Sequence, residues 1–326
     1  MADAMAGTRV LVVIPCLNEA AHLAHLLAVM SEDAPLATIV VADGGSSDGS
    51  QRIVEQVVAT NPLVHLLDNP RRLQSAGVNL AVERFGDGHD WLVRVDAHCG
   101  YPRGYVAGLL QAAAETSADA VVVPMRTVGR TCFQRAAAAA QNSRLGTGGS
   151  PHRHVGRGRW VDHGHHALCS IARYRAVGGY DEGFSHNEDA ELDHRLGLAG
   201  ARIWLEPTLA LDYLPRASPR ALLRQYRGYG RGRAQTVRRH RMRLKPRQLA
   251  PLAVVPAILM LPLALLWWPF AVPFLLWTGL CLAGGLAIGR RQRDLCASAA
   301  GVAAIIMHAG WGFGFLRQSL RAASRS

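Results

Sequence analysis

The first 125 residues alternate between short apolar runs and segments whose apolar residues recur at helical spacing. Five runs are typical of fully buried strands: Val10–Ile14, Thr38–Val41, Val64–Leu67, Trp91–Val95 and Ala120–Pro124. Segments such as Ser75–Phe85 lie between them and carry the helical pattern. Strands that are apolar at every position, separated by helices, favour a parallel sheet covered on both faces. We therefore predict an α/β fold, in which ligands bind at the carboxyl ends of the strands.

The C-terminal part is apolar enough to cross a lipid bilayer. No charged residue occurs in the 41 positions from Leu249 to Gly289, whereas about 20 apolar residues suffice for one crossing. Trp267-Trp268-Pro269 interrupts the run and is typical of an interfacial turn. We predict three spans, at about 249–268, 270–289 and 295–316, the third of them full-length or re-entrant. Core helices of a soluble domain are the alternative, but such helices rarely lack charge over so long a run.

Most of the positive charge lies directly before this apolar region. The chain of 326 residues has a net charge of +12, and residues 212–247 contain twelve Lys/Arg and one acid. A basic segment next to a membrane span is the juxtamembrane pattern, which holds a protein against anionic lipid. Nucleic acid is the other usual partner of such a segment, but no nucleic-acid-binding motif accompanies it. We therefore expect an anionic membrane surface, not nucleic acid, as the partner.

These features divide the chain into an α/β domain (1–211), a basic juxtamembrane segment (212–247) and a membrane domain (248–326). The first apolar run is short and ends at Pro15, with no basic region before a long apolar stretch, so it differs from a secretory signal. The α/β domain is therefore expected on the cytoplasmic side of the cell inner membrane. A hydrophobic content of 49% excludes a disordered chain, and six cysteines without a CxxC pair exclude a disulfide-built scaffold and suit a reducing compartment.

Polar motifs follow several of the predicted strands. Pro15-Cys16-Leu17-Asn18-Glu19 follows the first, Asp43-Gly44-Gly45-Ser46-Ser47 the second and Asp96-Ala97-His98 the fourth, while Asn187-Glu188-Asp189 opens a predicted helix over Glu188–Ala199. Each motif alone has a structural explanation, such as a turn at Asp43 or first-turn acids that complement a helix dipole at Glu188. Their occurrence together at the ends of parallel strands favours one functional site.

In order and wording these motifs resemble the family-2 glycosyltransferases, which have a GT-A fold. The wording Arg94-Val95-Asp96-Ala97-His98 and the segment Gly228–Arg233 are most similar to the membrane-bound enzymes of the succinoglycan biosynthesis type. The resemblance covers about residues 8–240. It implies a Rossmann-like, mostly parallel sheet with helices on both faces, followed by a transmembrane helical region. It also implies the transfer of a sugar from a nucleotide-sugar to an acceptor hydroxyl.

The resemblance assigns the nucleotide-sugar site to the strand ends. It implies that Pro15, Asn18 and Glu19 line the nucleoside pocket. It implies further that Asp43 contacts the base and that Arg71, or Arg72 beside it, reaches the diphosphate. A solvated loop pair is the alternative for the two arginines. The chain departs from the family at Gly44, where members often carry a second Asp.

A divalent cation, Mn²⁺ or Mg²⁺, is the implied cofactor. The family holds it with a DxD motif, because a cation stabilises the developing charge of a diphosphate leaving group. Here the motif ends in His98, whose neutral imidazole can still bind Mn²⁺. We therefore expect Asp96 to bind both the metal and the nucleotide-sugar, and His98 to complete the metal site.

Inversion at the anomeric carbon needs a base that accepts the proton of the acceptor hydroxyl. The resemblance assigns this role to Asp189, and Glu188 beside it would be structural or bind the acceptor. His165, Gln225 and Arg227 are further candidates for contact with the acceptor or the diphosphate.

Several histidines precede the helix predicted over Glu188–Ala199. They suggest a zinc cluster as an alternative to a role at the acceptor or the diphosphate. Their spacing fits no standard zinc pattern and no cysteine accompanies them. The residues concerned are His152, His154, His163, His165 and His166.

The sequence thus predicts an inverting hexosyltransferase that moves a sugar from a UDP-hexose to a lipid-linked (polyprenyl diphosphate) saccharide in surface polysaccharide biosynthesis. Polymer-forming relatives carry Gln-x-x-Arg-Trp where this chain has Gln225-Tyr226-Arg227-Gly228-Tyr229, which favours transfer of a single sugar. One alternative is a polyprenyl-phosphate glycosyl synthase. Another is a non-catalytic membrane scaffold with a degenerate GT-A domain, which His98 and Gly44 favour and the presence of both Asp96 and Asp189 disfavours.

Overall fold

A computed structural model describes residues 7–150 and 156–323 of the chain. Its internal contacts divide the chain into two compact units. The first is Met1–Met125 with Val155–Asp212, and the second is Arg126–His154 with Tyr213–Ser326. The second unit therefore includes an internal segment that the sequence pattern grouped with the α/β domain. The short strands β7 (Met125–Thr127) and β11 (Leu211–Tyr213) lie where the chain passes from one unit to the other.

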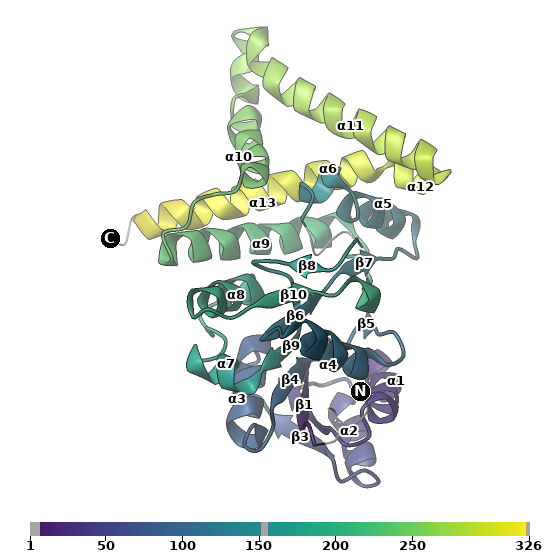
Figure 1. The fold of residues 1–326 in the computed structure, drawn as a ribbon. Helices are drawn as coiled ribbons and strands as arrows, with labels where there is room; N and C mark the ends of the chain where they lie inside the picture. The colour runs from purple at the N-terminus through teal and green to yellow at the C-terminus, as the bar shows by residue number, and fades with distance from the viewer. Residues whose placement is uncertain (1–6, 151–155, 324–326) are drawn as a thin grey trace. The chain divides into compact units, whose positions relative to one another are not determined.

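The first unit is built on an eight-stranded mixed sheet with the strand order β3-β2-β1-β4-β9-β6-β10-β8 (Figure 1). β3, β2, β1 and β4 run parallel, β9 is antiparallel to both β4 and β6, and β8 is antiparallel to β10. The mostly parallel sheet confirms the predicted α/β class. The strands are β1 (Val10–Cys16), β2 (Thr38–Asp43), β3 (Val64–Asp68), β4 (Trp91–Arg94), β6 (Ala120–Val123), β8 (Arg159–Trp160), β9 (His165–Ser170) and β10 (Ile203–Leu205).

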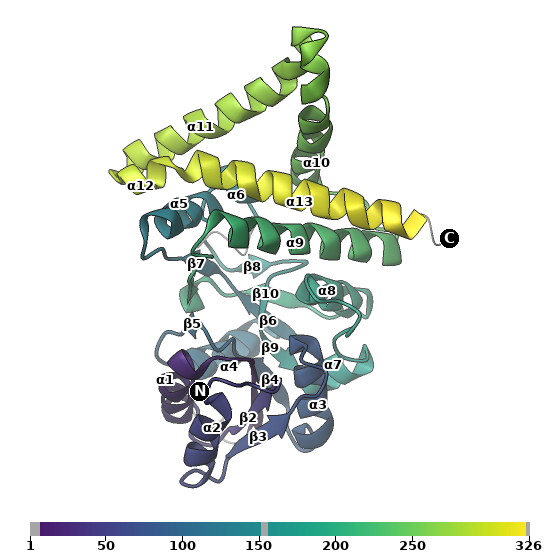
Figure 2. The ribbon, with the colours of Figure 1, turned by 180° about the vertical axis from the view of Figure 1, so that it is seen from behind.

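Helices cover both faces of this sheet because its strands are apolar on both sides (Figure 2). Along β1, Val12 and Ile14 belong to one buried cluster, while Leu11 and Val13 belong to another. The first cluster contains α1 (Ala20–Asp33), α2 (Ser50–Val58) and α4 (Tyr105–Thr116); the second contains α3 (Gln74–Phe85), α7 (Ile171–Ala176) and α8 (Glu188–Leu198). A strand β5 (Cys99–Gly100) and a 3₁₀ helix η3 (Pro207–Leu209) lie in the connections.

The strand register brings the polar motifs to one edge of the sheet. Cys16 at the end of β1 lies opposite Asp43 at the end of β2, which in turn lies opposite Asp68 at the end of β3. Burying each large apolar side chain of the strands contributes roughly 1.5–3 kcal/mol. The two apolar clusters therefore fix the strand ends, and with them the loops that carry the predicted site.

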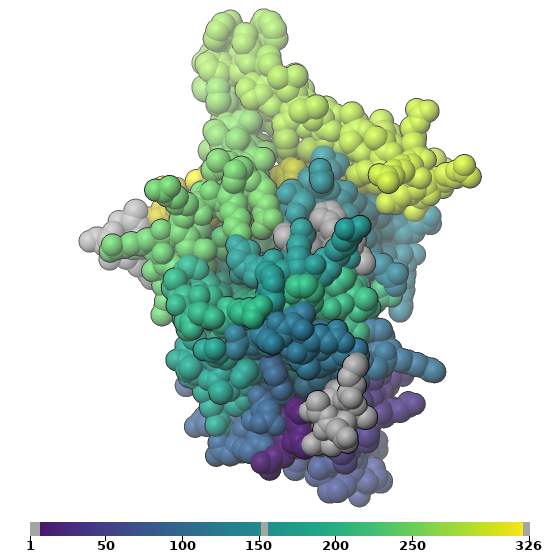
Figure 3. Space-filling model, viewed as in Figure 1, coloured from purple at the N-terminus to yellow at the C-terminus, as the bar shows by residue number. Residues whose placement is uncertain are grey.

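The second unit is helical, and α9 (Pro219–Arg239) lies beside α13 (Ala300–Ala323) in both ribbon views (Figures 1 and 2). α10 (Pro246–Leu259) and α11 (Val272–Gln292) form an apolar arm, joined by the 3₁₀ turns η4 (Leu261–Leu265) and η5 (Trp268–Ala271). In the space-filling view this light-green arm projects from the rest of its unit (Figure 3). The short helices α5 (Cys132–Gln141), α6 (Arg144–Thr147) and α12 (Leu295–Ser298) complete the unit.

Glycines allow α9 and α13 to approach closely. A Cβ built on Gly230 of α9 would lie 1.9 Å from the carbonyl oxygen of Trp311, and one on Gly314 of α13 would lie 2.1 Å from that of Arg227. Such small residues let two helix backbones pack directly together. The glycines in the third predicted span are therefore packing positions of α13, which also buries Ala303 and Met307 on its contact face.

The membrane prediction is supported at one of its three segments. Among the described residues, one helix, Trp268–Gln292, is long and apolar enough to cross a bilayer. Over the first predicted span, α10 has 14 residues and measures about 21 Å, less than the roughly 30 Å of a bilayer core, so this span stays a prediction. The third segment forms α13, one face of which packs on other helices of its unit. The structure thus supports one segment that is able to cross, and the other two predicted spans stay predictions.

A disulfide joins Cys132, the first residue of α5, to Cys296 in α12. An ion pair between Arg135 and Asp294 lies beside it, with 2.7 Å between Nη2 and Oδ1. The two cysteines are 164 residues apart in the sequence, so no spacing pattern indicates the bond. The remaining cysteines, Cys16, Cys99, Cys169 and Cys281, are free thiols.

Candidate active site

Hydrogen bonds tie the loop after β1 to the loop after β2. Asn18 has a left-handed backbone with φ of 58°, and its Oδ1 accepts a hydrogen bond from the backbone N of Ser47 at 2.8 Å. The backbone N of Asn18 donates to Ser46 Oγ at 2.8 Å, and that of Glu19 donates to Ser50 Oγ at 3.0 Å. These contacts hold Asn18 and Glu19 at the sheet edge where a ligand is expected, and half-buried Pro15 lies just before them in β1.

Asp43 is buried at the end of β2 and organises the same loop. Its Oδ2 accepts hydrogen bonds from the backbone N of Gly45 and of Ser46, both at 2.9 Å, and from Gln51 Nε2 at 2.6 Å. Burial acts to raise the pKa of Asp43, but the hydrogen bonds from Ser46 and Gln51 outweigh it and lower the pKa below its ordinary value. Asp43 is therefore a carboxylate at neutral pH that shapes the loop, and its contact with a base stays a prediction.

Arg94 links the two carboxylates that the sequence assigns to donor and acceptor. Arg94 is the last residue of β4, and its side chain is 4% exposed. Nη1 donates hydrogen bonds to Asp189 Oδ1 and to the Tyr180 hydroxyl, the latter at 3.1 Å, and Nε lies 3.5 Å from Asp96 Oδ1. The Tyr180 hydroxyl donates to the same oxygen of Asp189 at 2.8 Å. Burial acts to lower the pKa of Arg94, but Asp189 and its other neighbours raise it well above the ordinary value, so the guanidinium stays charged.

His165 lies between the same two carboxylates. Its Nδ1 accepts from Arg94 Nη2 at 3.3 Å, so the neutral ring carries its proton on Nε2, which lies 3.6 Å from Asp96 Oδ2. The other Asp96 oxygen accepts a hydrogen bond from Gln74 Nε2 at 3.1 Å. Burial acts to raise the pKa of Asp96, but Arg94 and His165 outweigh it and lower the pKa. Both Asp96 oxygens thus face polar groups within one connected cluster.

Glu188 has a different environment from Asp189 beside it. Its Oε2 is buried and has no hydrogen-bond partner among residues 7–150 and 156–323. Burial, and after it the charge of Asp189, raises the pKa of Glu188 to about 7. A carboxyl that exchanges its proton near neutral pH is suited to acid or base work, whereas Asp189 is held in an ion pair by Arg94.

The remaining acids of α8 and two of the histidines form a separate cluster. His166 Nε2 lies 2.6 Å from Asp193 Oδ1, and His163 Nδ1 lies 2.8 Å from Asp193 Oδ2. Burial acts to raise the pKa of Asp193, but the two histidines lower it well below the ordinary range. Glu191 pairs with Arg195 on the same helix. Of the predicted histidines, only His165 among those described contacts Asp96 and Asp189.

Asp96 and His98 are the candidate metal ligands, and their chemistry fits a divalent cation. His98 is 44% exposed, and its Nδ1 lies 3.2 Å from Glu19 Oε1. The part of the chain that the structure describes contains no group of three or more His, Cys, Asp or Glu that could hold a metal ion, and His152 and His154 of the zinc alternative lie outside it. A cation bound with a nucleotide diphosphate takes several ligands from phosphates and water, so one carboxylate and one imidazole suffice.

Three further residues, Arg71, Gln225 and Arg227, are candidates for contact with the diphosphate or the acceptor. Arg71, 69% exposed, forms an ion pair with Glu182. Gln225 lies on α9 in the second unit, where its Nε2 donates to the Tyr213 hydroxyl at 2.7 Å and to the Tyr229 hydroxyl at 3.1 Å. Arg227, on the same helix, is exposed. The roles of these three residues stay predictions.

Arg94 and Tyr180 are site residues that the sequence analysis did not identify. Arg94 has a recognisable signal, since it is a charged residue in an otherwise apolar strand, two positions before Asp96. Buried cations need anionic partners, so such a residue predicts nearby carboxylates. Tyr180 has no such signal, because its position depends on how the connection between α7 and α8 folds.

Comparison with known proteins places this geometry in context. Residues 11–173 match glycosyl transferase family 2. Over 320 residues the chain is 49% identical to the succinoglycan biosynthesis protein ExoA of Rhizobium meliloti (strain 1021), which covers 98% of this chain and 97% of that protein. It is also 31% identical over 123 residues to an undecaprenyl-phosphate mannosyltransferase of Micrococcus luteus, covering 37% of this chain and 50% of that protein.

A solved structure shows the same fold. The mannosyltransferase PcManGT from Pyrobaculum calidifontis, in complex with GDP-Man and Mn²⁺, superposes with a TM-score of 0.61. The match covers 92% of this chain and 86% of that chain, with 20% sequence identity. The chain therefore has a GT-A-like α/β fold.

The raised pKa of Glu188 predicts a stability effect. Between its ordinary value of 4.5 and about 7, the folded chain binds a proton that the unfolded chain has lost, so the free energy of unfolding falls as pH rises through this window. Glu188→Gln has no carboxyl to titrate and should not show this loss. From pH 4.5 to pH 8, the free energy of unfolding of the variant should therefore rise relative to that of the wild type by about 1–3 kcal/mol. Denaturant titrations at the two pH values measure it. The exposed Glu83→Gln is the matched control, and equal pH dependence in all three proteins would contradict the assignment.

Proposed function

Because the chain belongs to glycosyl transferase family 2, we propose that this glycosyltransferase moves the sugar of a UDP-hexose to a hydroxyl of a lipid-linked saccharide, with inversion at the anomeric carbon. It is homologous over nearly its whole length to ExoA, a protein of succinoglycan biosynthesis. This homology supports a role in exopolysaccharide biosynthesis, with a polyprenyl diphosphate carrying the acceptor saccharide.

The observation that carries the proposal is the placement of Asp96 and Asp189 around one buried arginine. Asp96 lies at the end of β4 and serves the donor, while Asp189 lies in the first turn of α8 and serves the acceptor. Arg94 contacts both, so donor and acceptor chemistry are held within one cluster of side chains. Transfer in a single displacement requires this proximity.

On the donor side, the loops after β1 and β2 would bind the nucleoside and Asp96 the diphosphate. Asn18 and Glu19 supply the rim of the nucleoside pocket, beside Pro15, and Asp43 keeps the second loop in place. Asp96 and His98 would hold a Mn²⁺ or Mg²⁺ ion. When bound, the cation stabilises the charge that develops on the diphosphate leaving group.

On the acceptor side, Asp189 would accept the proton of the attacking hydroxyl. The oxygen attacks the anomeric carbon while the nucleoside diphosphate leaves from the opposite face. Arg94 and the Tyr180 hydroxyl contact Oδ1 of Asp189, so the acceptor hydroxyl would approach Oδ2, which lies 4.0 Å from His165 Nδ1. Glu188, with a pKa of about 7, would hold an acceptor hydroxyl beside it.

We also propose that the apolar arm attaches the enzyme to the inner membrane from the cytoplasmic side. Its leucines, including Leu275, Leu276 and Leu280, are exposed. Because α13 packs beside α9, both ends of the arm lie on one side of the membrane, so α10 and α11 form a hairpin that returns rather than a multi-pass bundle. A cysteine placed at Leu320 should therefore resist an impermeant reagent in cells with a permeabilised outer membrane, and labelling there would favour three spans.

The product of the reaction tests the proposed function. Membranes containing the enzyme are incubated with labelled nucleotide-sugars, and the lipid products are separated. Lengthened oligosaccharide-lipid is the expected result. An acid-labile monosaccharide-phosphate lipid would instead favour a polyprenyl-phosphate glycosyl synthase, to which the similarity with the undecaprenyl-phosphate mannosyltransferase points. Absence of transfer with every donor would contradict both.

Asp189→Asn tests the base. The amide is nearly isosteric but cannot accept the proton, so turnover should fall by about 10²-fold or more, as for loss of other general bases. Donor binding, measured by titration with the nucleoside diphosphate, should survive. Asp193→Asn alters another acid of α8, one that is more buried than Asp189 and lies outside the cluster, and serves as the control. Near-normal turnover of the purified Asp189→Asn protein would remove Asp189 from this role.

Removal of divalent cations tests the metal site. Chelation should abolish transfer, and added Mn²⁺ or Mg²⁺ should restore it, because the leaving diphosphate then regains its counterion. His98→Asp should retain activity and shift the preference between the two ions, since it replaces nitrogen by oxygen. Full activity in the presence of a chelator would exclude the cation from the reaction.

A further inference from the structure

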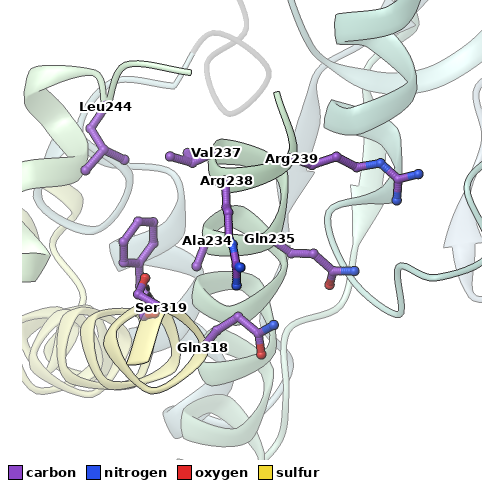
Figure 4. Close-up of a pocket in the computed structure, with 9 residues that line it drawn as sticks. Ala234, Gln235, Val237, Arg238, Arg239, Leu244, Gln318 and Ser319 are labelled. Carbon is purple, nitrogen blue, oxygen red and sulfur yellow. Dashed lines mark hydrogen bonds between the residues drawn. The ribbon is translucent and has the colours of Figure 1, made fainter. Parts of the chain in front are cut away.

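The second unit contains an open cavity of about 650 Å³. It lies between the C-terminal end of α9, the connection that leads to α10, and the last turns of α13. Figure 4 shows Leu244 and Val237 on one side of it and Gln235 and Arg239 on the other, while Arg238 extends from α9 toward Gln318 of α13. Its volume is within the range of small-molecule sites.

The cavity is cationic, and no carboxylate belongs to its lining. Arg238 and Arg239 are both exposed within it. The second unit contains 23 Lys/Arg and a single acid, Asp294, which pairs with Arg135. An anion is the ligand that these two exposed guanidinium groups would attract.

The other side of the cavity is apolar. Val237, Leu244 and Phe315 line it. Leu244 stands two residues before α10, the first helix of the apolar arm, so the cavity lies at the base of the segment that would enter the bilayer. Apolar groups next to cations at this level match the boundary between acyl chains and head groups.

We propose that this cavity binds the phosphate head group of an anionic membrane lipid, with Arg238 and Arg239 on the phosphate and the apolar side against the start of an acyl chain. The inference rests on the membrane attachment proposed above. It assigns the site to a bilayer lipid that fixes α9 and α13 at the surface.

Titration of the purified full-length chain in a neutral detergent tests the site, because the micelle has no surface charge of its own. The probes are short-chain phosphatidylglycerol, short-chain phosphatidylcholine and inorganic phosphate. Phosphatidylglycerol should bind saturably, and the other two at least about tenfold more weakly, which corresponds to about 1.4 kcal/mol or more between the ligands. Inorganic phosphate binding as tightly as the lipid would overturn the lipid assignment.

Three variants separate the cavity from general attraction. Arg238→Gln with Arg239→Gln should weaken phosphatidylglycerol binding about tenfold. Ser319→Phe should do the same without changing the charge, because Ser319 is exposed and lines the cavity. Arg290→Gln with Arg291→Gln removes equal charge at the far end of α11 and should leave binding unchanged. The proposal would be overturned if the control variant lost as much affinity for phosphatidylglycerol as the Arg238 and Arg239 variant. It would also be overturned if Ser319→Phe bound phosphatidylglycerol as tightly as the wild type.

Vesicle flotation distinguishes failure of the cavity from failure of the proposed attachment. The wild-type chain should float with phosphatidylcholine vesicles through its apolar arm, and more strongly when phosphatidylglycerol is present. No flotation with either would contradict membrane attachment itself. Flotation together with unsaturable phosphatidylglycerol titration would contradict the cavity alone.

Discussion

The first unit depends on a charged arginine inside its sheet. Arg94 lies at the end of a central strand, is almost fully buried and contacts Asp96, Asp189, Tyr180 and His165. A buried cation is expensive unless carboxylates pair with it, and removal of one partner commonly costs about 3–5 kcal/mol. The fold therefore requires these acids at the place where the chemistry also requires them. Structural demands and the proposed chemistry thus coincide at one group of contacts, which also joins the loop to Tyr180 and the start of α8 to the end of β4.

The same arrangement gives two adjacent carboxyls different properties. Asp189 is fixed by Arg94 and Tyr180, whereas the buried Oε2 of Glu188 has no hydrogen-bond partner within the described part of the chain, and burial raises the pKa of Glu188 to about 7. Pairs of acids whose environments separate their pKa values are the usual way in which one site provides distinct roles near neutral pH.

The charge of the chain is also divided: the first unit carries 13 Lys/Arg and 23 acids, and the second carries 23 Lys/Arg and one acid. The net charge of +12 thus conceals an acidic first unit and a strongly basic second unit.

Sequence patterns predicted the features that depend on local order. The apolar runs predicted the strands, and the predicted site residues included Asp96, His165 and Asp189, which the structure brings to one cluster. Features set by long-range folding were missed. The role of Arg94 depends on partners from residues 165–189 as well as on Asp96, and the Cys132–Cys296 bond joins segments with no spacing signal. Hydropathy also does not reveal that Pro251 and Pro256 lie in a short α10, or that Gly310 and Gly314 of α13 face α9 while Gly312 faces α10.

The coupling between Arg94 and Asp189 is the most direct test of this account. Denaturant unfolding of the wild type, Arg94→Gln, Asp189→Asn and the double variant forms a double-mutant cycle. If the arginine is the cation around which the site is organised, each single variant leaves an uncompensated buried group. The loss of stability in the double variant should then be smaller, by about 2 kcal/mol or more, than the sum of the losses in the two single variants. Losses that add to within about 0.5 kcal/mol would show that the two residues act independently and would contradict the central claim.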